Sequence, residues 1–197
     1  EIYNYRELRA DLLAKGHRFE TAGDSEVLLA SYMEWGEACL TRLNGMFAFA
    51  IYDQDKDMIF MARDRAGEKP LFYAHTSEAF IFGSELKALM ACPLFERRLD
   101  LVAMDFFMAY GYVPGEMCIL QGANKLRPGH ALRYNRRNNT VQVWPYWKLP
   151  EAEVASVTDA HKLVEELEHL LTDAVKRQLV ADVPVGILLS GGLDSSL

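Results

Sequence analysis

The chain has 197 residues, of which 50% are hydrophobic and 25% are charged, a balance typical of a globular protein that buries a sizeable core. Its formal net charge of −7 argues against nucleic-acid binding through the phosphate backbone, and its apolar runs are too short to span a membrane. The three cysteines (Cys39, Cys92 and Cys118) have no zinc-ligand spacing, and are typical of reduced thiols in a cytoplasmic protein.

Two helices are expected at the start of the chain. In the segment 5–19, the apolar residues Leu8, Leu12 and Leu13 recur at helical spacing, and Gly16 provides a C-terminal stop. The segment 23–37 predicts a second helix with Asp24 or Ser25 at its N-terminus, because short polar side chains there accept hydrogen bonds from free backbone N–H groups.

Strands are expected to dominate the middle of the chain. The apolar segment 45–53 and the segment 58–64 flank a polar turn, and two more strands are expected within 69–75 and 79–85. The segments 130–135 and 140–144 flank the letters RRNN and predict a hairpin. Helices followed by many strands indicate an α+β fold rather than an alternating βαβ pattern.

A second domain is expected to begin near residue 155. The segment 148–159 is polar and is interpreted as a linker, and apolar residues then recur at helical spacing from Leu163 to about Leu179. The apolar run 182–190 that follows predicts a strand buried on both faces of a parallel sheet, as in α/β domains.

The last motif, SGGLDSS at 190–196, follows that expected strand. Gly191 and Gly192 permit a sharp turn and a close approach of oxygen atoms, and backbone N–H groups at a helix start attract anions. Asp194 would repel a phosphate unless Mg²⁺ bridged the two. The lysine of a Walker-A loop is absent. On spacing alone, a phosphate site and a tight turn without a ligand both remain open.

SGGLDSS is similar to the pyrophosphate-binding loop of the PP-loop ATPases, and the longer string VPVGILLSGGLDSS resembles the glutamine-hydrolysing asparagine synthetase family. In that family ATP is cleaved between its α and β phosphates. The resemblance implies Mg²⁺ supported by Asp194, and ATP contacts at Leu188, Ser190, Gly191, Gly192, Asp194 and Ser195.

The front of the chain resembles the same family along its length. The strings EIYNYRELRADL, TAGDSEVLLASYMEWG, RDRAGEKPLFY and FGSELKAL follow one another in the family's order. The resemblance implies a class II glutamine amidotransferase domain of the Ntn-hydrolase fold, a two-sheet sandwich with helical layers. We expect this domain over 1–150 and the start of the ATP-binding α/β domain over 155–197, in a fragment truncated at both ends.

The resemblance implies that Glu1 and Asp24 hold the α-amino end of glutamine, which carboxylates do through charge-assisted hydrogen bonds. From the residues alone, Asp24 would be interpreted as an ordinary helix cap. The family's nucleophile is an N-terminal cysteine whose own α-amine serves as the base. Residue 1 is Glu, so no catalytic residue is expected within these 197 residues, and the three cysteines are interpreted as structural.

A charged set of residues, Arg63, Asp64, Lys69 and Glu85, falls among the expected strands. It is either a structural network or the lining of a site, and a structural ion-pair group is the favoured interpretation. The five histidines show no metal-ligand spacing.

The resemblance implies an enzyme that hydrolyses glutamine and transfers the ammonia to a β-aspartyl-adenylate, giving asparagine, AMP and pyrophosphate. Its partners would be glutamine, aspartate or another carboxylate, and ATP with Mg²⁺, without nucleic acid or membrane; a homodimer is left open. Three alternatives also stay open: an amidotransferase acting on a sugar or other carboxylate in polysaccharide synthesis, a cysteine-less ATP-dependent cyclase, and a binding module without turnover.

A substitution at Asp194 tests the ATP assignment. In the complete enzyme, Asp194→Asn is expected to reduce both ammonia-dependent and glutamine-dependent synthesis, because both use the same adenylate, while glutamine hydrolysis alone persists. Exchange of labelled pyrophosphate into ATP in the presence of candidate acids measures the chemistry. A product of ADP rather than AMP would contradict the assignment.

Overall fold

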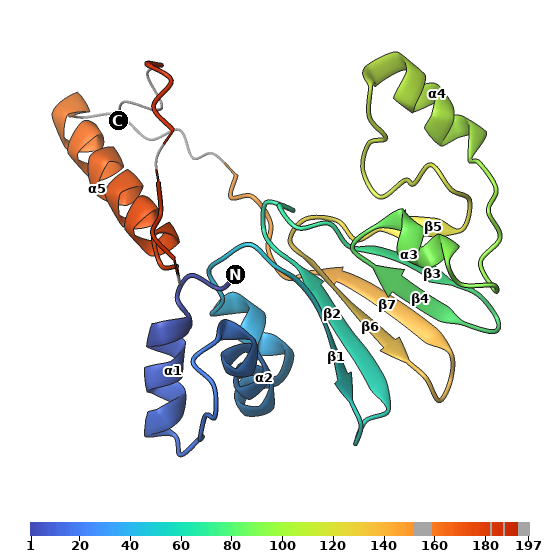
Figure 1. Cartoon of the computed structure of the whole chain (residues 1–197), viewed down its shortest axis with the longest axis horizontal. Helices are drawn as coiled ribbons and strands as arrows, with labels where there is room; N and C mark the ends of the chain where they lie inside the picture. The colour runs from blue at the N-terminus through green and yellow to red at the C-terminus, as the bar shows by residue number, and fades with distance from the viewer. Residues whose placement is uncertain (152–158, 182, 187, 193–197) are drawn as a thin grey trace. The chain divides into compact units, whose positions relative to one another are not determined.

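The computed structural model describes residues 1–151, 159–181, 183–186 and 188–192. The chain divides into two compact units, Glu1–Pro150 and Glu151–Leu197, and each is considered by itself (Figure 1).

The first unit begins with two helices close to the predicted ranges. Helix α1 covers Tyr5–Ala14 and is followed by Gly16 at φ +94°, a conformation that glycine adopts without strain. Helix α2 covers Asp24–Trp35 and continues into a short 3₁₀ helix, η1, over Gly36–Thr41. Both predicted helices are confirmed: α1 buries Leu8 and Leu12, and α2 buries Val27 and Ala30. Leu13, which was counted with the apolar residues of the first helix, is 51% exposed.

Seven strands form two antiparallel sheets in the first unit. The four-stranded sheet has the order β1-β2-β6-β7, with β1 at Ala48–Asp53, β2 at Met58–Arg63, β6 at His130–Asn135 and β7 at Thr140–Pro145. The three-stranded sheet has the order β4-β3-β5, with β4 at Phe80–Gly83, β3 at Phe72–His75 and β5 at Ala123–Lys125. Two further helices, α3 (Leu86–Met90) and α4 (Leu101–Tyr110), follow the β3–β4 hairpin.

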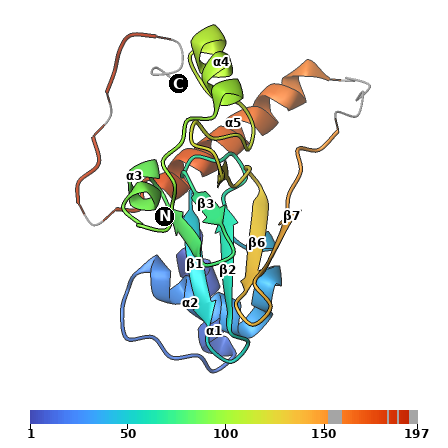
Figure 2. The same cartoon turned by 90° about the vertical axis from the view of Figure 1, so that its right-hand side faces the viewer.

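Alternation along the strands produces a four-layered sandwich. On β2, Phe60 faces the core shared with α1 and α2, whereas Met61 faces the core shared with the second sheet. The rings of Phe80 on β4 and Tyr134 on β6 stack at 4.4 Å between the sheets, and Leu89 of α3 packs on the outer face of the second sheet. Figures 1 and 2 show the helices α1 and α2 beside the four-stranded sheet. The predicted two-sheet sandwich with helical layers is confirmed.

The second unit contains helix α5, Ala160–Gln178, whose start is capped by the Asp159 carboxylate accepting the His161 N–H at 3.0 Å. The strand predicted over 182–190 is not formed by the described residues 183–186 and 188–190, and Leu188 is 95% exposed. A parallel strand gains its hydrogen bonds only from neighbouring strands, and the described part of this unit has none. The apolar run alone therefore predicted the wrong local structure for these residues.

The end of β1 is fixed by Asp53, whose side chain is 12% exposed. Its carboxylate accepts the Lys56 N–H at 3.0 Å and the Tyr32 hydroxyl at 2.9 Å, and lies 2.8 Å from the Lys56 ammonium. These bonds, foremost the one from the Lys56 side chain, lower the pKa of Asp53 to about 2. The carboxylate thus joins the β1–β2 turn to helix α2.

The low pKa of Asp53 makes the stability of the first unit sensitive to acid. Because the folded pKa of about 2 lies below the usual 3.8, the stabilisation is complete above about pH 5 and is lost as the pH falls from about 4 towards 2. The melting temperatures of the wild type and Asp53→Asn should therefore differ at pH 7 and converge towards pH 2. Asp55→Asn, in the same turn, is the control and should show no such convergence. A difference between wild type and Asp53→Asn that does not change with pH would contradict this account.

Candidate functional site

A pocket of about 400 Å³ opens in the first unit where five segments of the chain meet. Its lining comes from residues 1–2, the N-terminal part of α2, residues 46–49, residues 69–70 and Ser84. Both residues of the first unit that were assigned to a ligand from the sequence, Glu1 and Asp24, line this pocket. The structure therefore brings together side chains that are 23 positions apart in the sequence.

The position of Glu1 depends on a close contact between two backbone segments. The Glu1 nitrogen donates to the Met46 carbonyl at 2.8 Å, and the Met46 N–H donates to the Glu1 carbonyl at 3.0 Å. A Cβ atom at Gly45 would lie 2.2 Å from the Glu1 carbonyl oxygen, well inside contact distance. Glycine at position 45 is what lets residues 1–2 run beside residues 45–46.

Asp24 is the first residue of α2, and its carboxylate points away from its own helix N–H groups. The residue before it, Gly23, occupies the cap position, and no side chain caps the helix. One carboxylate oxygen of Asp24 accepts the Ile2 N–H at 2.9 Å, and the side chain stays 33% exposed. The capping role that the residues alone favour for Asp24 is thus not observed; the carboxylate instead anchors residue 2 at the rim of the pocket.

The residues that line the pocket carry charges of both signs and aromatic rings. They include the acidic residues Glu1 and Asp24, the basic residue Lys69, and Phe47 and Phe49. Carboxylates bind an ammonium group through charge-assisted hydrogen bonds, and an ammonium group does the same for a carboxylate. This arrangement can bind a small zwitterionic molecule with an extended, partly apolar body.

The charged set Arg63, Asp64, Lys69 and Glu85 is not the ion-pair group favoured from the sequence. The guanidinium group of Arg63 and the carboxylate of Asp64 bond to backbone groups instead of to each other. Lys69 lines the pocket, and Glu85 forms an exposed ion pair with Lys87 at 2.6 Å. Sequence spacing could not show this division, because backbone partners leave no trace in residue identities.

The residues assigned to ATP lie in the second unit. Leu188, Ser190, Gly191 and Gly192 are exposed, Gly191 has φ +74°, and the Gly192 N–H donates to the Ser190 hydroxyl at 3.4 Å. Asp194 and Ser195 lie outside the described residues. Within the described ranges, no group of three or more His, Cys, Asp or Glu side chains is placed to bind a metal ion. The roles of these residues remain predictions.

None of the three cysteines lines the 400 Å³ pocket of the first unit. Cys39 and Cys118 are buried, and burial raises the pKa of Cys39 to about 12, so its thiol stays protonated and unreactive at neutral pH.

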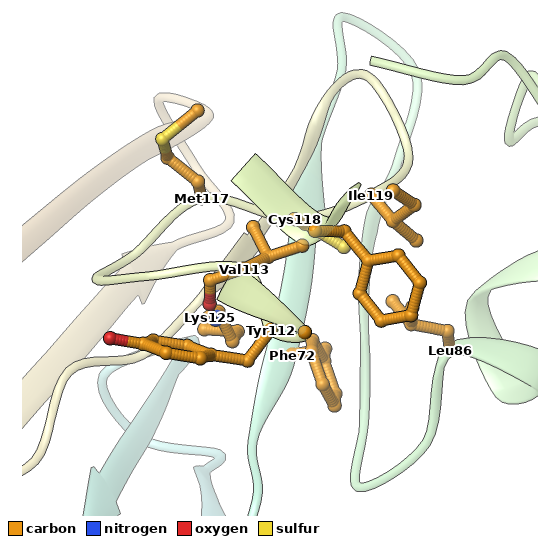
Figure 3. A pocket seen from close by; sticks show the side chains of 10 residues that line it. Phe72, Leu86, Tyr112, Val113, Met117, Cys118, Ile119 and Lys125 are labelled. Atoms are coloured by element: carbon orange, nitrogen blue, oxygen red, sulfur yellow. Dashed lines mark hydrogen bonds between the residues drawn. The ribbon is translucent and has the colours of Figure 1, made fainter. Parts of the chain in front are cut away.

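A second cavity of about 500 Å³ lies between the second sheet and α4 (Figure 3). Its lining is apolar apart from Lys125 and the Tyr112 hydroxyl; the Lys125 ammonium donates to the Val113 carbonyl, and burial lowers its pKa. No carboxylate lines this cavity, so it lacks the charged partner that an amino-acid ammonium group would have in the first pocket.

Several pocket residues were not identified from the sequence, among them Ile2, Phe47 and Ser84. Lys69 was named as part of the charged set, but a structural role was favoured for it. Lys69 and Ser84 belong to strings, RDRAGEKPLFY and FGSELKAL, that contributed to the family resemblance, and this was the available signal.

Among the described residues, no helix combines the length and apolar character needed to cross a membrane.

Two family models match the chain. The model of a glutamine amidotransferase domain matches residues 1–147, and the model of asparagine synthase matches residues 166–197. The chain is 44% identical to asparagine synthetase [glutamine-hydrolyzing] 3 of Bacillus subtilis and 39% identical to a putative asparagine synthetase [glutamine-hydrolyzing] 2 of Methanocaldococcus jannaschii. In both comparisons the whole chain is covered, but only 31% and 38% of the relative, so the chain spans about a third of their length.

Among solved structures, the glutamine phosphoribosylpyrophosphate amidotransferase of B. subtilis matches with a TM-score of 0.50. The match covers 75% of this chain and 28% of that chain, at 20% sequence identity. This likeness concerns the fold, and it agrees with the two-sheet sandwich of the first unit.

Substitution at Gly45 tests the backbone contact that forms one side of the pocket. Gly45→Ala places a Cβ against the Glu1 carbonyl and is expected to cost about 2–3 kcal/mol, because overpacking against backbone cannot be relieved by a side-chain rotation. That corresponds to a fall in melting temperature of about 5–10 °C. Gly23→Ala, with no atom within 4 Å of its Cβ, is the control and should cost less than about 1 kcal/mol. Equal melting temperatures for the two variants would contradict the contact.

Proposed function

Because this chain belongs to the glutamine-hydrolysing asparagine synthetase family, with a glutamine amidotransferase domain and the start of an asparagine synthase domain, we propose that its 400 Å³ pocket binds glutamine. The observation that supports this most directly is the presence of both Glu1 and Asp24 in the lining of one pocket. The α-ammonium of glutamine would bind these carboxylates. The Asp24 carboxylate already lies 3.9 Å from one cationic nitrogen, the amino group of Glu1.

The pocket residues of this chain would bind and orient glutamine rather than attack it. Asp24, held by the Ile2 N–H, fixes the ammonium end, so the apolar stem of the ligand lies over Phe47 and Phe49. Fixing one end of the substrate presents the side-chain amide in a defined position, which lowers the entropy cost of the reaction. The nucleophile proposed by the family resemblance is the thiol of an N-terminal cysteine outside these 197 residues, with its own α-amine managing the proton.

The proposed use of the ammonia is synthesis of an amide from a carboxylate activated by ATP. Aspartate is the proposed acceptor, because the relatives are named asparagine synthetases. The exposed glycines of the 190–192 segment suit a phosphate, since Gly191 adopts a positive φ and no atom of the described residues lies within 4 Å of its Cβ position. Ser190, Gly191, Gly192, Asp194 and Ser195 would hold the pyrophosphate and Mg²⁺, and Leu188 would contact the adenine. ATP would supply the activation of the carboxylate. The three free cysteines support a cytoplasmic location for the enzyme.

A charge-neutral substitution at Asp24 tests the glutamine assignment. Asp24→Asn keeps an acceptor oxygen for the Ile2 N–H but removes the charge that faces the ligand's ammonium. Losing a charged hydrogen bond costs about 1.5–3 kcal/mol, so the KM for glutamine should rise roughly 10- to 100-fold. Synthesis from free ammonia should be unchanged, because ammonia needs no such anchor.

Glu34→Gln is the matched control for this experiment. Glu34 lies near the other end of α2, where it pairs with Lys15 at 2.9 Å and His17 at 3.0 Å, so its loss affects stability and not the pocket. If Asp24→Asn lowered the ammonia-dependent and glutamine-dependent rates equally, Asp24 would be structural and the assignment wrong.

A further inference from the structure

Two adjacent residues at the end of β2 hold the backbone that forms one wall of the pocket. Asp64 is 1% exposed, and its carboxylate accepts three backbone N–H groups: Glu68 at 2.9 Å, Lys69 at 3.0 Å and Phe47 at 3.3 Å. A buried carboxylate with N–H partners is bound tightly to them, because no water is available to replace a lost bond. The loop after β2 and the segment that enters β1 are thus tied to one side chain.

Arg63 holds the carbonyl groups of the same loop. Its guanidinium group donates to the Lys69 carbonyl at 2.7 Å, to the Gly67 carbonyl at 2.6 Å and, across the sandwich, to the Leu126 carbonyl at 2.8 Å. A planar group with five N–H donors can reach three such acceptors at once, which a lysine ammonium cannot do in the same geometry. Within one loop, Arg63 therefore binds C=O groups and Asp64 binds N–H groups.

Gly67 shows how closely this arrangement is packed. Its φ is +72°, and a Cβ atom there would lie 2.6 Å from Pro128 Cγ and 3.2 Å from the guanidinium carbon of Arg63. The string RDRAGEKP is explained by these contacts: the first two residues supply the bonds, and the glycine makes room for the guanidinium group.

The backbone that is held leads directly into the pocket. Phe47, Lys69 and the next residue, Pro70, all line it, whereas Arg63 and Asp64 do not. On the other side, Glu1 and Asp24 are placed by bonds to Met46 and Ile2. We propose that Asp64, assisted by Arg63, is a positioning residue for glutamine: it fixes the Phe47–Lys69 wall relative to Asp24. This inference rests on the proposed function of the pocket.

The proposal predicts a specific kinetic effect for Asp64→Asn. The amide of Asn offers one acceptor oxygen and one NH₂ group, so at least one of the three N–H donors would face another donor. The displaced wall should raise the KM for glutamine about tenfold, with a change in kcat of less than about threefold, because the wall contacts the part of the substrate that does not react. Ammonia-dependent synthesis should stay within about twofold of the wild type.

Asp53→Asn is the matched control. Asp53 also stands at the end of a strand, is largely buried and accepts a backbone N–H, but the residue that it holds, Lys56, does not line the pocket. Both variants are expected to lose stability, but Asp53→Asn should leave the KM for glutamine within about twofold of the wild type. Hydrogen exchange adds a second readout: the amides of Glu68 and Lys69 should exchange at least about tenfold faster in Asp64→Asn only.

Each outcome separates this inference from the function on which it rests. If the wild-type enzyme does not hydrolyse glutamine, the proposed function is wrong. If it does, and the KM of Asp64→Asn is unchanged or rises equally in Asp53→Asn, the positioning role is wrong. Should Asp64→Asn fail to fold, Arg63→Lys replaces it, since an ammonium loses part of the three-carbonyl contact while keeping the charge; an unchanged KM for that variant would likewise overturn the proposal.

Discussion

The junction between the two sheets of the first unit is built around the buried carboxylate of Asp64. The Asp64 carboxylate accepts three backbone N–H groups. In addition, the Asp64 N–H donates to the Phe47 carbonyl at 2.8 Å, and the Asp64 carbonyl accepts the Gly129 N–H at 2.8 Å. The end of β2, the loop towards β3 and the entry to β6 therefore meet at one residue. Removing a charge from water is costly unless polar groups replace the solvent, so this residue and its backbone partners have to be retained together.

The pocket follows from this junction and from the packing of α2. One wall is formed by the loop after β2. The other is formed by the start of α2 and by residues 1–2, which can lie beside Gly45 because glycine has no Cβ atom. No single segment contains the site: its acidic residues are Glu1 and Asp24, its basic residue is Lys69, and its aromatic residues are Phe47 and Phe49. The sandwich thus acts as a rigid frame that combines short-range pieces into a ligand-sized cavity.

Local sequence signals were sufficient for most elements but not for their assembly. The β1–β2 and β6–β7 hairpins were predictable because their turns contain Asp57 and Asn139. Among the described residues these are the two non-glycine residues with positive φ, a conformation that Asp and Asn tolerate. The pairing of β2 with β6 was not predictable, since it joins residues that are far apart in the chain. Helix α4 was missed because its segment is almost wholly apolar and shows no periodic alternation. In the site, Glu1 and Asp24 came from the family resemblance, whereas the roles of Arg63 and Asp64 depend on backbone partners that a sequence does not display.

The pairing of β2 with β6 has a consequence for the order in which the chain is made. Ala62 of β2 lies opposite Ala131 of β6 in the sheet, so one edge of β2 has no partner until about 70 further residues have left the ribosome. When the chain is synthesised at about 5–20 residues per second, the backbone groups of that edge remain unpaired for several seconds. The apolar side chains of Phe60 and Met61 on the same strand lack their complete packing during this time. A nascent chain in this interval presents an unpaired hydrophobic strand to its neighbours, so the risk of aggregation is greatest before β6 has been synthesised.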